Sequence, residues 1–76
     1  MSFLLYGKHL IRWVDSQGKW HDPDKTFRAL DYSGVRVNKL TDAGEYATRE
    51  DAEEAMLKAK PRIDKGDVAI EIRVAK

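Results

Sequence analysis

The sequence predicts an α+β fold in which a small antiparallel sheet carries one helix on one face. Three observations predict it. Short runs of strand-forming residues separated by turn signals fill the first half, and an alanine-rich segment with helical spacing follows at about residues 49–60. An alternating segment at about residues 67–75 then predicts a C-terminal strand. The 76 residues suffice for a single domain, residues 1–76, with one small core.

The first half contains a hairpin signal at residues 15–18 (DSQG). Asp suits the first position of a turn and Gly supplies a left-handed residue, so the chain should reverse here. If the loop has these four residues, Trp13 lies opposite Trp20. If Gly18 forms a bulge, the register slips and Val14 faces Trp20 instead. One of the two tryptophans should be partly exposed, because the hairpin tip lies far from the predicted helix.

Strand-forming residues also occur on both sides of this hairpin. Residues 3–14 favour a strand with a kink or turn at Gly7. Residues 22–24 (DPD) should interrupt the pairing, because proline donates no backbone hydrogen bond. Residues 26–32 and 35–40 then predict two further strands. The core is expected to include four large apolar side chains: Phe3, Leu5, Ile11 and Phe27.

The clearest element is the helix at about residues 49–60. Thr48 suits an N-cap, and Asp51 three residues later suits an approximate capping box. Acidic side chains crowd the start of the segment and basic ones its end, as the helix dipole favours. Pro61 should end the helix. The apolar stripe consists of four residues at helical spacing: Ala52, Ala55, Met56 and Ala59.

The last segment alternates between an apolar and a mostly polar face. The apolar face consists of Val68, Ile70, Ile72 and Val74, and the other face of Ala69, Glu71 and Arg73. A strand with one buried and one solvated face has this pattern. A long final strand at an edge of the sheet would allow homo-oligomerisation through that edge.

Composition excludes several classes of function. The absence of Cys removes disulfides, thiolate nucleophiles and cysteine-ligated zinc sites, and it fits a reducing compartment. No apolar run approaches the roughly 20 residues of a membrane span. We therefore expect a soluble, cytoplasmic protein with no membrane association.

Residues for catalysis or for binding a metal or cofactor are sparse. His9 and His21 are the only histidines, and the adjacent His21 and Asp22 would point to opposite faces of a strand. Residues 22–24 imitate the start of a calcium loop, but the later Gly and Glu that such a loop needs are missing, which favours an Asx-type turn. We expect no enzyme, no metal and no cofactor. Convergence of both histidines with carboxylates in an enclosed cleft would contradict this expectation.

An acidic cluster precedes and begins the predicted helix. Helix-start electrostatics account for Glu50 and its acidic neighbours, but not for Asp42 and Glu45 in the preceding loop. A compact acidic patch could dock on a basic groove of another protein, with tryptophans as anchors. The candidate partner-binding residues are Trp13, Trp20, Asp42, Glu45, Glu50 and Glu54.

Rings and positive charges interleave in the first half, which gives an alternative function. Exposed rings stack nucleic-acid bases at about 1–3 kcal/mol each, beside cations that contact phosphates. The strand motif of RNA-recognition domains is absent, however. The alternative nucleic-acid face consists of Arg12, Lys19, Trp20, Arg28 and Arg36.

Residues 45–56 (EYATREDAEEAM) resemble a pattern of small phage and prophage accessory proteins of β-β-α-β type. In these proteins an aromatic residue ends a strand, Thr or Ser caps a helix, and a Glu/Ala-rich helix leads to a last strand. The similarity extends over about residues 45–74. Some such proteins inhibit bacterial defence nucleases, anti-CRISPR proteins among them. The resemblance implies an inhibitor of that kind, and it carries over no functional residue.

The expected function is therefore a small non-enzymatic module that binds another protein. A phage or mobile-element inhibitor that occupies a host protein's surface, for example a nucleic-acid-binding groove, is the specific form that the resemblance implies. A small nucleic-acid-binding protein is the alternative.

Overall fold

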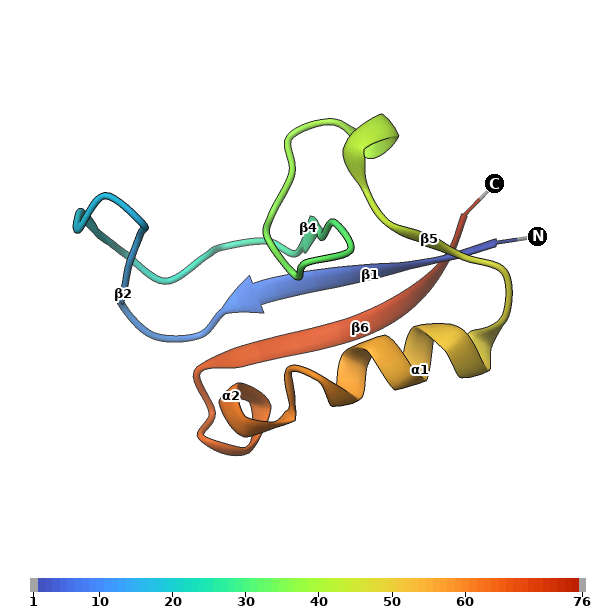
Figure 1. Cartoon of the computed structure of the whole chain (residues 1–76). Coiled ribbons are helices and arrows are strands. Elements are labelled where there is room, and N and C mark those ends of the chain that lie inside the picture. The colour runs from blue at the N-terminus through green and yellow to red at the C-terminus, as the bar shows by residue number, and fades with distance from the viewer. Residues whose placement is uncertain (1, 76) are drawn as a thin grey trace.

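The computed structural model describes residues 2–75, and its main sheet is built around the N-terminal strand β1 (Ser2–His9). β6 (Val68–Ala75) pairs antiparallel with β1 from Ser2–Ala75 to His9–Val68. The short strands β4 (Arg28–Ala29) and β5 (Glu45–Tyr46) therefore share the other edge of β1 (Figure 1). This α+β arrangement, an antiparallel sheet with a helix and a C-terminal strand, confirms the predicted fold class.

Apolar residues are buried on both faces of this sheet. On one face, α1 (Arg49–Leu57) packs through Ala52 against Leu5 and Leu30. On the other face, Leu4 and Ala29 pack against Ala43, which follows the short helix η1 (Leu40–Asp42). Figure 1 shows α1 and η1 on opposite sides of the long strands. Within residues 2–75, no helix is long and apolar enough to cross a membrane.

The start of the helix is confirmed, but its end differs. The Thr48 side chain accepts a hydrogen bond from the Asp51 backbone N–H at 3.1 Å, as a capping residue does. α1 ends at Leu57, and a second helix, α2 (Lys60–Asp64), follows. Pro61 lies in the first turn of α2, where a missing N–H costs nothing. The prediction that Pro61 terminates a helix running to about residue 60 is therefore wrong.

The strand predictions in the first half need three corrections. β1 runs through Gly7 without a kink, because Gly7 makes room for Leu30: a Cβ there would lie 3.0 Å from Leu30 Cδ1. The strands expected at residues 26–32 and 35–40 shorten to β4 and an isolated bridge between Leu30 and Arg36. Ile11 is half exposed, whereas Leu5 is buried and Phe3 and Phe27 are partly buried.

The hairpin has the register that a bulge at Gly18 predicts. β2 (Trp13–Val14) pairs with β3 (Trp20–His21) so that Val14 lies opposite Trp20. Gly18 has φ of +82°, and the Asp15 side chain accepts hydrogen bonds from the backbone N–H groups of Gln17 and Lys19 at 2.9 Å each. Residues 31–35 repeat the same turn around Asp31. Local turn chemistry thus settles the register.

Candidate functional site

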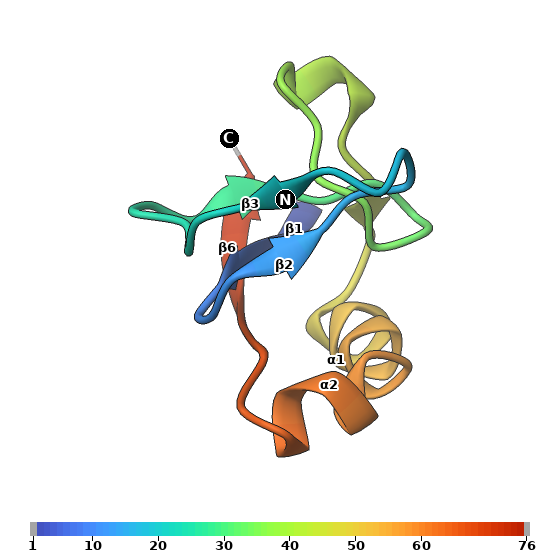
Figure 2. The same cartoon turned by 90° about the vertical axis from the view of Figure 1, so that its left-hand side faces the viewer.

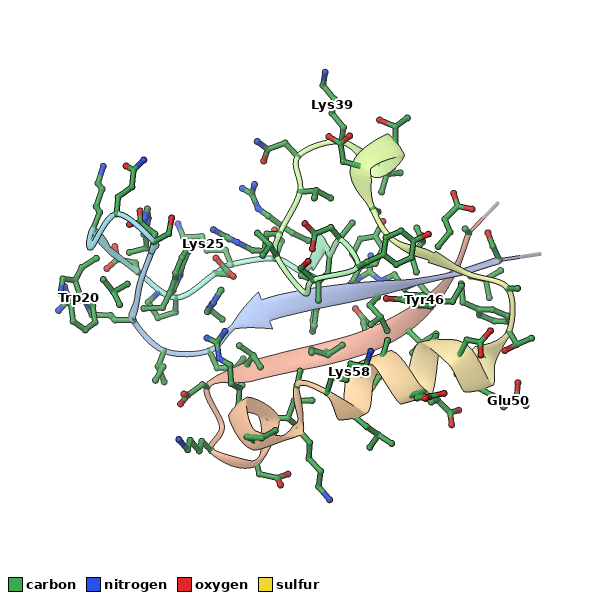
Figure 3. The ribbon with its side chains drawn as sticks, viewed as in Figure 1. Trp20, Lys25, Lys39, Tyr46, Glu50 and Lys58 are labelled. Carbon is green, nitrogen blue, oxygen red and sulfur yellow. The ribbon has the colours of Figure 1, made fainter. Side chains whose placement is uncertain are left out.

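The hairpin β2–β3 belongs to an arm, residues 10–23, that projects beyond the end of β1 (Figures 1 and 2). Trp20 is 61% exposed, and Figure 3 places it at the far end of the arm. The Arg12 guanidinium lies 5.4 Å from the centre of the Trp20 ring. We call five exposed residues of the arm the Trp20 surface: Leu10, Ile11, Arg12, Val14 and Trp20. An apolar patch with a cation on a projecting element is typical of a contact surface.

The base of the arm is fixed to the sheet by the carboxylate of Asp24. Its Oδ2 accepts a hydrogen bond from the His9 backbone N–H at 2.8 Å and lies 3.1 Å from His9 Nδ1. Its Oδ1 accepts a hydrogen bond from Arg36 Nη1 at 2.6 Å. The Asp24 side chain is only 10% exposed, so this ion pair is largely removed from water. The Asp24 carboxylate, which follows the arm, therefore joins His9 at the end of β1 to Arg36, which follows the turn at residues 31–35.

Trp13 occupies the centre of the same cluster. The imidazole rings of His9 and His21 stack on the indole with centroid distances of 4.2 and 4.5 Å. The Arg36 guanidinium lies 4.6 Å from the centre of the Trp13 ring. On the arm itself, His21 Nε2 lies 2.7 Å from Asp15 Oδ2. We call these six residues the Asp24 cluster: His9, Trp13, Asp15, His21, Asp24 and Arg36.

The charges of the cluster follow from burial and from these contacts. Burial lowers the pKa of His9 below its ordinary value, as do the charges of Arg62 and Arg36, and the opposing effect of Asp24 is smaller. Burial alone would raise the pKa of Asp24, but the hydrogen bonds from His9 and the charge of Arg36 together lower it. At neutral pH, His9 is therefore neutral, and Asp24 carries the charge that pairs with Arg36.

The two histidines do converge with carboxylates, which sequence spacing did not predict. His9 meets Asp24 and His21 meets Asp15, whereas the adjacent pair His21 and Asp22 makes no such contact among residues 2–75. The Asx-type turn predicted at residues 22–24 does not form, because the Asp24 backbone N–H donates to the His9 carbonyl and the Asp24 carboxylate bonds to His9 and Arg36. Within the described part of the chain, no group of three or more His, Asp or Glu side chains could hold a metal ion.

A partly open groove of about 980 Å³ lies beside the cluster. Four members of the cluster, His9, Trp13, Asp15 and Arg36, form part of its wall, whereas His21 and Asp24 do not line it. Ala55 and Ala59 line the side next to α1, and their short side chains leave the space open. Figure 3 shows Lys58 pointing from the end of α1 toward the sheet, over this groove. Each histidine–carboxylate pair therefore contributes one member, His9 or Asp15, to the wall of a groove that is partly open to solvent.

The predicted acidic patch is divided between two sides of the molecule. Asp42 lies on η1 and Glu45 shares the face of Leu4, whereas Glu50 and Glu54 lie one turn apart on α1, on the other side of the sheet (Figure 1). All four acidic side chains are exposed. They therefore lie as two separate acidic pairs.

The predicted basic residues are also dispersed. Arg12 and Lys19 lie on the arm with Trp20, but Arg36 is bound to Asp24, and Arg28 Nη1 donates a hydrogen bond to Asn38 at 3.3 Å. Trp13, predicted as an anchor, is enclosed by the Asp24 cluster. Of the candidate aromatic and basic residues, the structure therefore brings together Trp20, Arg12 and Lys19.

Comparison of the chain with protein-family models, with curated proteins and with solved structures finds no match. The site described here therefore rests on its own geometry.

Proposed function

We propose that this chain is a non-enzymatic module that binds another protein through the Trp20 surface. The observation that carries the proposal is a tryptophan, 61% exposed, that stacks with Arg12 at the end of a projecting arm. Trp and Arg contribute disproportionately to binding energy at protein interfaces. A small rigid domain can hold a partner through about 800 Å² of its own surface.

The Asp24 cluster has a structural role in this proposal. The Asp24 carboxylate is saturated by groups of its own chain, and the rings of His9 and His21 are stacked on Trp13. Such a cluster holds the arm in one orientation before binding, so that less conformational entropy is lost when the partner docks. The histidines thus support the surface and do not act on a substrate.

The resemblance of residues 45–56 supports a more specific form of the proposal: a phage or mobile-element inhibitor that covers a host protein's surface in the cytoplasm. The absence of Cys fits that compartment. The two acidic pairs, Asp42 with Glu45 and Glu50 with Glu54, would then add electrostatic contacts to a basic partner surface.

The test compares Trp20→Ser with the matched control Leu57→Ser, which removes an equally exposed apolar side chain from α1. Proteins captured from a lysate of the producing cells are identified, and the affinity of a captured partner is measured by calorimetry. We expect Leu57→Ser to bind as the unmodified chain does, and Trp20→Ser to bind at least tenfold more weakly, as loss of an interface anchor implies. Equal affinity of the two variants would contradict the proposal.

A gel-shift assay with single- and double-stranded oligonucleotides near 50 mM salt is the second arm of the test. No shift at high micromolar protein is the expected result. A shift that Trp20→Ser abolishes and that weakens steeply with salt would establish the nucleic-acid function instead.

A further inference from the structure

The outer edge of β6 is open. The inner edge of β6 pairs with β1 over Val68–Ala75 without interruption, and no other strand of residues 2–75 pairs with β6. Proteins usually protect such an edge with Lys, Pro or a bulge, because its free N–H and C=O groups attract another strand. Val68–Ala75 contains neither Lys nor Pro, and its continuous ladder to β1 leaves no bulge. The edge is therefore competent for pairing along its length.

We infer that the occupant of this edge is β6 of a second copy of this chain, paired antiparallel about a twofold axis at Ile72. This register places Glu71 of each copy opposite Arg73 of the other, so that two oppositely charged pairs face each other across the junction. Moving the axis to Glu71 or to Arg73 places two like charges opposite each other. The charges on the strand therefore favour an axis at Ile72 over an axis at either charged residue.

The neighbouring side chains support the same register. On the α1 face, Ile72 lies opposite Ile72 of the second copy, and Val74 lies opposite Ile70. Val74 is 51% exposed in the single chain, so pairing covers apolar surface that solvent now contacts. On the other face, Arg73 Nη2 lies 2.6 Å from Glu71 Oε1 of the same copy, and its guanidinium lies 4.1 Å from the centre of the Tyr6 ring on β1, so pairing brings a second Glu71 to an arginine that already has one acidic partner.

Charge variants test the pairing while leaving the strand's backbone unchanged. Glu71→Arg gives a strand with two positive charges, and Arg73→Glu gives a strand with two negative charges. Sedimentation equilibrium from 10 µM to 1 mM should show the mass of the unmodified chain rising above 8.7 kDa toward twice that value. Each variant alone should self-associate about tenfold more weakly, because like charges then face each other. An equimolar mixture of the two variants should associate again, which excludes misfolding as the cause.

A constant mass of 8.7 kDa for the unmodified chain at 1 mM would overturn the inference. Self-association of both charge variants at the strength of the unmodified chain would overturn the register.

A cross-linking experiment tests the axis directly. The chain contains no Cys, so a single introduced Cys can form a disulfide only with a second copy. In the inferred register, Ile72→Cys lies opposite itself at a Cα separation of about 4.5–5.5 Å, which a disulfide spans. Val74→Cys, four residue steps from its own copy and about 13 Å away, should stay monomeric under the same oxidant. Equal cross-linking of the two variants would contradict an axis at Ile72.

Discussion

Removal of the Asp24 carboxylate should destabilise the chain more than any other change to an acidic side chain. Asp24→Ala leaves the His9 N–H and the Arg36 guanidinium, which bond to it at 2.8 and 2.6 Å, without their acceptor. Breaking a buried ion pair by removing one partner costs about 3–5 kcal/mol. We expect the lower end, about 3 kcal/mol, because the Arg36 side chain is 25% exposed.

The loss is a large fraction of the stability that a chain of this size has. At about 0.05–0.15 kcal/mol per residue, the 76 residues supply about 4–11 kcal/mol. With a urea m-value of about 1–1.5 kcal/mol per M, the unfolding midpoint should fall by about 2–3 M. Asp24→Asn, whose amide oxygen still accepts one hydrogen bond, should lose about half as much.

The assay is urea unfolding at pH 7, followed by far-ultraviolet circular dichroism and tryptophan fluorescence. Asp22→Ala is the matched control, since this exposed neighbour makes no hydrogen bond through its side chain within residues 2–75, and it should change stability by less than about 0.5 kcal/mol. If Asp24→Ala and Asp22→Ala unfold at the same urea concentration, the structural role of Asp24 is refuted.

Three further predictions concern the same region. The free energy of unfolding should fall as the pH drops below about 6.5, because the pKa of His9 is lower in the folded chain and protonation therefore favours the unfolded chain. A His9→Gln variant, followed over the same pH range, should not show this decrease. Trp13→Phe should lower the free energy of unfolding by about 1 kcal/mol, because the buried indole Nε1 has no acceptor within residues 2–75 and so loses no hydrogen bond. Trp13→Ala, which also removes the ring, should lower it by about 3 kcal/mol or more. Equal losses for the two variants in urea unfolding would contradict this. Gly7→Ala should lower the melting temperature by several degrees, as a new methyl group presses on Leu30, whereas Ser16→Ala should leave it unchanged.

Elements that depend on neighbouring residues could be predicted from the sequence. The Thr48 cap acts on a backbone group three residues later, and the Asp15 turn is closed by Gly18. The alternation of β6 predicted a strand, but burial follows it only in part: Ile70 and Ile72 pack in the core next to α1, whereas Val74 on the same face is 51% exposed. The α+β class followed from these local signals because each one fixes an element type without reference to the rest of the chain.

The candidate site depends on residues distant in sequence, which is why it was missed. His9 and Asp24 are 15 residues apart, and Arg36 is a further 12 residues along the chain. No spacing rule connects His9 at the end of β1, Asp24 after Pro23 and Arg36 after the turn at residues 31–35. The expected kink at Gly7 failed for the same reason, since the side chain that requires glycine there is Leu30.

The pairing of the first strand with the last determines when this chain can fold. Ser2 lies opposite Ala75, so β1 gains its long partner only after residues 68–75 have been synthesised. At about 5–20 residues per second, a nascent chain waits roughly 3–12 s between completing β1 and beginning β6. During that delay β1 has no long partner strand, so the apolar side chains of Leu4 and Leu5 lie outside the native core.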